Sequence, residues 1–153
     1  MILIATGAEA DGAEARRARE AAAASVRESG ATALADALVP KLLAAEPAEQ
    51  SPELLDHLRR VIEAAPVPGI VGALAAMRER HDQTGLLPTL AGLPALIIVG
   101  AEDAITPPET ARRVAAAIPG ARLVVVPGAG HLPMVERPGE STAAIAEFLR
   151  VVG

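Results

Sequence analysis

Three short apolar runs stand out along the chain, and none of them alternates with polar positions. They are "ILIA" at Ile2–Ala5, "ALIIVG" at Ala95–Gly100 and "LVVV" at Leu123–Val126. A continuous apolar run of this length is typical of a parallel strand that is covered on both faces of its sheet. The pattern therefore predicts three buried, parallel strands.

The segment between the second and third runs has the spacing of a helix. Thr106 and Glu109 are placed like the two partners of a capping box, so Thr106 is expected to cap the start of the helix. Pro119 and Gly120 then end it. A strand, a helix and a second strand within about thirty residues form a βαβ unit, whose strands are parallel neighbours. A closing helix is expected at Ser141–Val152.

The middle of the chain has helical patterns only. The helical segments are residues 13–30, 31–45, 51–65 and 68–80. Pro40 is expected to interrupt the second of them. This organisation predicts an α/β fold, in which residues 1–12 form the first core strand and the lead into a helical cap at residues 13–84. Residues 85–153 are expected to form the C-terminal core, with a strand, a helix, a strand and the closing helix.

Composition and charge narrow the functional classes. With 153 residues, of which 51% are hydrophobic, the chain can fold around a core. The net charge is −5 and the basic residues are scattered, which argues against a nucleic-acid or anionic membrane partner. Cysteine is absent, and the sequence shows neither a secretory signal nor an apolar run of membrane-spanning length. We therefore expect a cytoplasmic location and no thiolate metal site.

Two polar residues follow the second and third predicted strands. Asp103 stands three residues after Gly100, and His131 stands five residues after Val126. Ligands bind beyond the carboxyl ends of the strands in an open parallel sheet, and neighbouring strands bring their loops together there. An aspartate that orients an imidazole is half of the arrangement that activates a nucleophile. Asp103 and His131 are therefore the candidate catalytic residues, and we expect their side chains to be in contact.

Other interpretations of these residues remain open from the sequence. Glu102 is an alternative acid, Asp103 could serve only as a turn residue, and His131 could serve only as a loop histidine at a strand end. His57 is interpreted as a solvated residue on the outer face of a helix, and His81 as a residue at the C-terminal end of a helix or in the linker that follows. The three histidines lack the spacing of metal ligands, and the glycines after the third strand do not form a dinucleotide fingerprint. We expect neither a metal nor a cofactor.

The segment "LPALIIVGAEDAITPPETARRVAAAIPGARLVVVPGAGHLPMVERP" carries a resemblance to a known family. It resembles the C-terminal part of α/β-hydrolase fold enzymes, in which the acid stands in "VGxxDxxTPP" and the histidine in "PGxGHxPxxExP". The preceding helices resemble the cap of that family more loosely, and the subgroup that fits is small esterases and lactonases similar to 3-oxoadipate enol-lactonase. The resemblance implies that Asp103 is the triad acid, that His131 is the base, and that the substrate is a small carboxylic ester or lactone.

The same resemblance implies a nucleophile in a G-x-S-x-G turn that precedes the acid and the histidine. Ser25, Ser29 and Ser51 lack the flanking glycines. Ser141 in "GESTA" is a near match, but it follows both candidate residues and no strand precedes it, so it is interpreted as part of a helix start.

We therefore expect the C-terminal part of a hydrolase, inactive alone, whose partner is a complementing N-terminal half that carries the nucleophile and the oxyanion hole. Two alternatives remain. The chain could be a folding or binding module without catalysis. It could also be part of a relative with an aspartate nucleophile, such as a dehalogenase or an epoxide hydrolase, because these share the acid and histidine loops.

Overall fold

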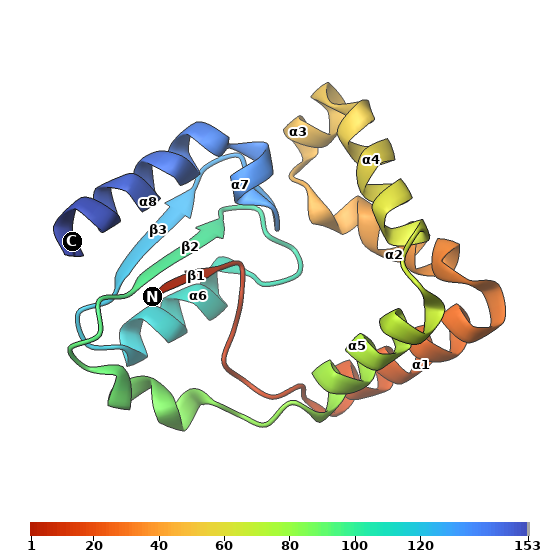
Figure 1. Ribbon diagram of the computed structural model, residues 1–153, viewed down its shortest axis with the longest axis horizontal. Coiled ribbons are helices and arrows are strands. Elements are labelled where there is room, and N and C mark those ends of the chain that lie inside the picture. Colours follow the sequence, from red (N-terminus) through yellow and green to blue (C-terminus); the bar gives the residue numbers. More distant parts are fainter. Residues whose placement is uncertain (153) are drawn as a thin grey trace. The chain divides into compact units, whose positions relative to one another are not determined.

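The computed structural model describes residues 1–152 and contains one parallel sheet of three strands (Figure 1). The strands are β1 (Ile2–Ile4), β2 (Leu96–Gly100) and β3 (Arg122–Val126). Their order in the sheet is β1-β2-β3, with Ile2 opposite Leu96 and Leu96 opposite Arg122. The three strands predicted from the apolar runs are confirmed, with ends that differ by one residue.

The central strand β2 is covered on both faces, as its unbroken apolar sequence predicts. Ile97 and Val99 pack against helix α6 (Pro108–Ala117), whereas Leu96 and Ile98 pack against helix α8 (Pro138–Val152) on the other face (Figure 1). Because side chains alternate between the faces of a strand, one apolar segment serves two cores. Phe148, the only aromatic residue of the chain, fills the α8 side and is 4% exposed.

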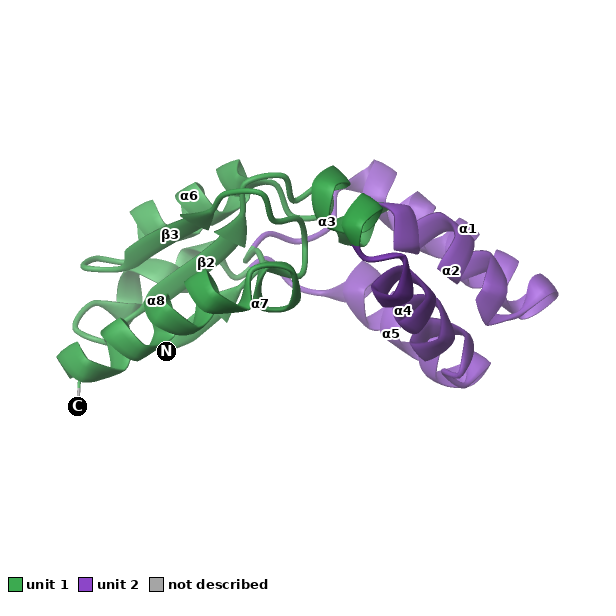
Figure 2. Cartoon of the chain, turned by 90° about the horizontal axis from the view of Figure 1, so that it is seen from above, with its two compact units in different colours: residues 1–8, 41–50, 83–153 green, residues 9–40, 51–82 purple. Residues whose placement is uncertain are grey.

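The chain divides into two compact units (Figure 2). Unit 1 consists of residues 1–8, 41–50 and 83 onward, and unit 2 consists of residues 9–40 and 51–82. The predicted cap of residues 13–84 therefore covers more than unit 2, because residues 41–50 group with the sheet. The reason is a set of hydrogen bonds between this segment and the loop after β3, described below.

Unit 1 holds three shorter helical elements besides α6 and α8. They are α3 (Ala45–Gln50), the 3-10 helix η1 (Thr84–Leu90) and α7 (Pro133–Glu136). The predicted linker into β2 thus contains η1, whose Leu87 is buried against the α6 face of the sheet.

Unit 2 is helical, in agreement with the predicted periodicity. Its helices are α1 (Ala13–Ser29), α2 (Ala31–Leu42, which ends in unit 1), α4 (Pro52–Glu63) and α5 (Val67–Glu79). Val26 of α1 packs with Ile70 and Leu74 of α5 in the core of the unit. Gly30 ends α1 with a φ of 77°, a conformation that favours glycine. The predicted interruption at Pro40 is wrong, because this proline lies in the last turn of α2.

Charged side chains join the helices of unit 2 at its surface. Arg59 of α4 donates to Asp36 of α2 over 2.6 Å. This hydrogen bond raises the pKa of the Arg59 guanidinium above its ordinary value. Among the described residues no single helix is long and apolar enough to cross a membrane, although α4 and α5, bent by 93°, pass that test of length and composition as a pair.

Candidate active site

The loop after β2 holds Asp103 in a fixed position beneath the surface. The Asp103 side chain is 0% exposed, and its Oδ1 accepts hydrogen bonds from the backbone N–H groups of Ile105 at 2.8 Å and Thr106 at 2.7 Å. Asp103 is thus a turn residue of the Asx type as well as a candidate acid. The predicted capping box is wrong: α6 begins at Pro108 without a side-chain cap. The physical reason is that the Thr106 N–H points to Asp103, so Thr106 belongs to the loop.

The loop after β3 approaches the loop after β2 backbone against backbone. The Glu102 N–H donates to the Ala129 carbonyl at 2.9 Å. A Cβ added at Gly100 would overlap the carbonyl oxygen of Gly130, and Gly128 has a φ of 62°. The close approach at Gly100 leaves no room for a Cβ, and the positive φ of Gly128 favours glycine. Together they allow the loop after β3 to bring the histidine over the end of β2.

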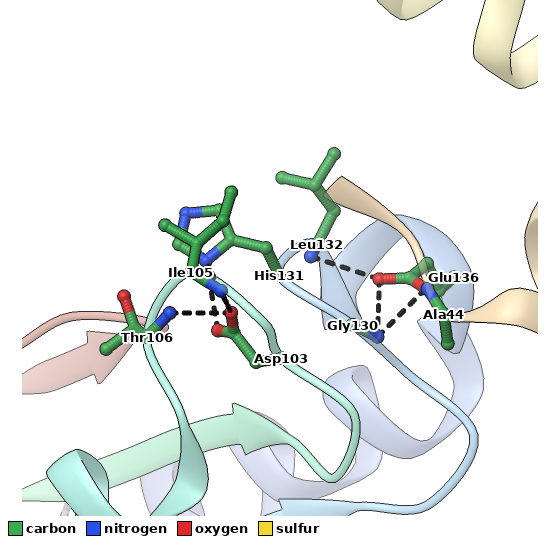
Figure 3. A network of polar contacts seen from close by, with 8 residues as sticks. All are labelled: Ala44, Asp103, Ile105, Thr106, Gly130, His131, Leu132 and Glu136. Carbon is green, nitrogen blue, oxygen red and sulfur yellow. Dashed lines mark hydrogen bonds and ion pairs between the residues drawn. The ribbon is translucent and has the colours of Figure 1, made fainter. Parts of the chain in front are cut away.

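The imidazole of His131 lies on the Asp103 carboxylate. His131 Nδ1 is 2.9 Å from Oδ2 and 3.2 Å from Oδ1 of Asp103. Because a carboxylate accepts hydrogen bonds, Nδ1 is the donor, and in the neutral ring Nε2 is then the nitrogen with the free lone pair. Figure 3 shows the second ring nitrogen directed away from Asp103, and the side chain is 22% exposed. The predicted contact between the two residues is confirmed.

The other candidate residues lie elsewhere. Glu102 is exposed and its carboxylate is not the partner of His131, so the alternative acid is wrong. His57 is exposed on α4, as predicted, and His81 follows the end of α5, as predicted, where it is also exposed. Both residues belong to unit 2. Among residues 1–152 no group of three or more His, Cys, Asp or Glu side chains is arranged to hold a metal ion.

Ser141 is a structural residue in this molecule. It lies in the first turn of α8, which begins three residues earlier at Pro138, so its interpretation as part of a helix start is confirmed. The side chain is buried, and its hydroxyl donates to the Pro133 carbonyl at 2.8 Å. That hydrogen bond joins α7 to α8. Ser25 and Ser29 are exposed on α1, and Ser51 precedes α4, so these three belong to unit 2.

A further carboxylate, the glutamate of "PGxGHxPxxExP", organises the histidine loop, and no role was assigned to it from the sequence. Glu136 accepts hydrogen bonds from the N–H groups of Gly130 and Leu132, on either side of His131, and from that of Ala44 (Figure 3). The short α7 helix places it there. The signal available in the sequence was the glutamate of that motif, five positions after the histidine and beside a loop whose N–H groups need acceptors.

One hollow of about 520 Å³ lies at the opposite end of the sheet, where β2 and β3 begin. Its lining is mostly apolar and includes Leu93, Pro94, Phe148 and Val151, with Arg122 at the start of β3. None of its lining residues belongs to the loops of Asp103 or His131, so we assign it no part in the chemistry of this pair.

Solved structures of hydrolases are similar to this chain. A thermophilic esterase from Thermogutta terrifontis is 41% identical, with a TM-score of 0.93 over 99% of this chain and 55% of that chain. The enol-lactonase from Burkholderia xenovorans LB400 is 31% identical, with a TM-score of 0.87 over 97% of this chain and 55% of that chain. The chain spans about half the length of these solved structures.

A curated relative with a similar sequence is also an esterase. The pimeloyl (acyl-carrier protein) methyl ester esterase of Edwardsiella ictaluri (strain 93-146) is 36% identical over 93 residues, which make up 60% of this chain and 36% of that enzyme. Residues 2–145 also match the alpha/beta hydrolase family as a whole. The resemblance seen in the strand, acid and histidine segments is therefore confirmed, and the chain belongs to the alpha/beta hydrolase family.

Proposed function

We propose that this chain supplies the acid and the general base of a hydrolase that acts on a small carboxylic ester or lactone. The observation that carries this function is the Asp103–His131 pair, with Nδ1 of the histidine 2.9 Å from a fully buried carboxylate. The similarity to a solved esterase and a solved enol-lactonase supports the substrate class. The absence of cysteine and the scattered charge agree with a cytoplasmic enzyme.

In this function Nε2 of His131 takes the proton from the nucleophile's hydroxyl as its oxygen attacks the carbonyl carbon of the substrate. The Asp103 carboxylate holds the ring in the tautomer that leaves Nε2 free, and it stabilises the imidazolium that forms. The imidazolium then returns its proton to the leaving alkoxide oxygen. Water then attacks the acyl carbon while His131 removes its proton. The imidazolium returns that proton to the nucleophile's oxygen as the acyl–oxygen bond breaks, and the acyl group leaves as the carboxylic acid.

The proposed nucleophile is a serine outside these 153 residues. No serine hydroxyl among residues 1–152 is hydrogen-bonded to His131, and Ser141 is committed to the Pro133 carbonyl. We therefore assign the nucleophile and the oxyanion donors to a complementing N-terminal half, which also contributes part of the substrate site.

A hybrid enzyme tests the assigned roles. This chain replaces the matching 55% of the Thermogutta terrifontis esterase, and hydrolysis of p-nitrophenyl acetate is measured. We expect turnover by the hybrid and none by this chain alone. His131→Ala should lower turnover about 10³-fold or more, because a positioned base and its triad are lost together. His57→Ala, at an exposed histidine of α4, is the matched control and should keep full activity.

The outcomes separate the alternatives. Turnover that survives His131→Ala would refute the role of the base. A folded hybrid without any esterase activity would favour a chain that serves only as a folding or binding module. Offering a small lactone and an epoxide beside the ester distinguishes the substrate classes, and the ester and the lactone are expected to react.

A further inference from the structure

Glu136 has an unusual set of partners for a partly exposed carboxylate. Its two oxygens accept from the Gly130 N–H at 2.9 Å each, from the Leu132 N–H at 3.0 Å and from the Ala44 N–H at 2.7 Å. All three donors belong to the main chain. Glu136 therefore fixes backbone segments to one another, a task that differs from pairing with a cation at the surface.

The fixed segments surround the candidate base. Gly130 and Leu132 are the two neighbours of His131, whose own N–H donates to the Leu42 carbonyl at 3.0 Å. The peptide groups on both sides of the histidine are thereby held, and both are tied to the same stretch around Leu42 and Ala44. The Cα of His131 is therefore held in one place, from which the side chain reaches Asp103 through Nδ1 (Figure 3).

A carboxylate suits this position because of its acceptor capacity. Three N–H groups converge on two oxygens, each with two lone pairs, and hydrogen bonds to a charged acceptor are stronger than those to a neutral one. A glutamine of the same shape offers one acceptor oxygen and turns an NH₂ donor toward the remaining N–H. The exchange of glutamate for glutamine therefore removes part of the arrangement while it keeps the volume of the side chain.

We propose that Glu136 is the positioning residue of His131. Its carboxylate holds the backbone on both sides of the histidine and ties it to Ala44, so that the imidazole stays on Asp103 with Nε2 presented to the substrate side. This role rests on the proposed function of His131 as the general base. Glu136 does not touch the reacting atoms and acts through His131 alone.

The test compares Glu136→Gln with Glu140→Gln in the full 153-residue chain. Glu140 is exposed in the first turn of α8, so its exchange removes the same charge nearby. NMR follows the amide exchange of Ala44 and Leu132 and the Nδ1 proton of His131, with the β2 amides as an internal reference. In Glu136→Gln, at least one of the two amides should exchange about 10- to 100-fold faster, as expected for a lost bond to a charged acceptor. The Nδ1 proton signal should broaden or disappear, while β2 and the Glu140→Gln protein stay unchanged.

Several results would overturn the role. One is an unchanged exchange of both amides with an intact Nδ1 signal. Another is faster exchange throughout β2 with the Nδ1 signal kept, which would make Glu136 a residue of general stability. If Glu136→Gln does not fold, Glu136→Asp keeps the charge on a shorter side chain, and it must show faster exchange at Ala44 or Leu132 before it does so in β2.

A kinetic measurement separates this role from the proposed function. In the hybrid esterase, Glu136→Gln should lower kcat with little change in KM, because the base is displaced while substrate binding remains. If His131→Ala leaves the turnover of the hybrid unchanged, the proposed function is refuted, whatever the effect of Glu136→Gln. A hybrid that depends on His131 but is indifferent to Glu136→Gln refutes the positioning role alone.

Discussion

Replacing Gly100 by alanine would test whether the acid and histidine loops are packed backbone against backbone. Gly100 is the last residue of β2, and an added Cβ would overlap the carbonyl oxygens of Ala129 and Gly130 and lie 2.6 Å from the Ala129 carbonyl carbon. These are main-chain atoms, so no side chain can rotate to make room. Gly100→Ala must push the histidine loop away from Asp103 or lower the stability of unit 1.

The size of the effect follows from the packing. An added methyl group in a well-packed interior lowers the free energy of unfolding by about 1–3 kcal/mol. We expect about 3 kcal/mol for Gly100→Ala, because the atoms in the way belong to the backbone and cannot rotate aside. At roughly 2–4 °C per kcal/mol for a chain of this size, the Tm should fall by about 6–12 °C. Gly139→Ala is the matched control in the same unit, because a Cβ there meets nothing within 4 Å and the residue lies in α8. Its effect should stay below about 1 kcal/mol.

The assay must suit a chain without Trp or Tyr. Far-UV circular dichroism follows the loss of helix on heating and in urea, and the m-value shows whether the transition itself has changed. NMR of the His131 Nδ1 proton reports whether the acid and the base stay together. If the Gly100→Ala protein has the same Tm as the Gly139→Ala protein and keeps this proton signal, the close packing of the two loops is refuted.

Three further predictions concern Asp103, Ser141 and the unpaired edge of β1. Asp103→Asn should lower turnover of the hybrid esterase about 10⁴-fold, because the amide favours the imidazole tautomer in which Nε2 carries the proton. The circular dichroism spectrum should stay unchanged, and a loss of turnover that is only small would contradict the orienting role of Asp103. Ser141→Ala should lower the free energy of unfolding by about 0.5–1.5 kcal/mol, because the Pro133 carbonyl loses one of two donors and keeps the Arg137 N–H. It should leave hydrolysis by the hybrid unchanged. Turnover by this chain alone that is lost in Ser141→Ala would instead identify Ser141 as a nucleophile. The chain should also self-associate, because Ile2–Ile4 form a strand that is paired on one side only among the described residues. Sedimentation as a monomer at high concentration, without binding of a hydrophobic dye, would contradict this expectation.

Local sequence patterns were enough to predict the sheet and the pair of candidate residues. The β2 strand could be read from "LIIVG" because a strand buried on both faces leaves no place for a polar residue. Asp103 and His131 could be paired because adjacent parallel strands bring the loops at their carboxyl ends together. Both inferences use rules that hold for any parallel sheet, so they needed no knowledge of distant contacts.

The errors came from contacts that the local pattern does not encode. Thr106 fits a capping box, but the Asp103 carboxylate competes for its N–H and excludes it from the helix. The bond that Ser141 donates to the Pro133 carbonyl was not predicted, because it depends on how α7 meets α8. Glu136 was missed for the same reason, since its partner Ala44 lies 92 residues away in the sequence.

The return of residues 41–50 to the sheet has a consequence for how the site can form. This segment divides the excursion between β1 and β2 into two stretches of similar length, residues 9–40 and 51–82. The contacts of Ala44 with Glu136 and of Glu46 with Arg137 each close a loop of about ninety residues. Closing such a loop costs conformational entropy before the contacts themselves can stabilise the fold. The βαβ segment has only short loops to close. Pairing of β2 with β3 and placement of the histidine are therefore separable events in folding, and a shortened protein that lacks residues 41–50 should build the first without achieving the second.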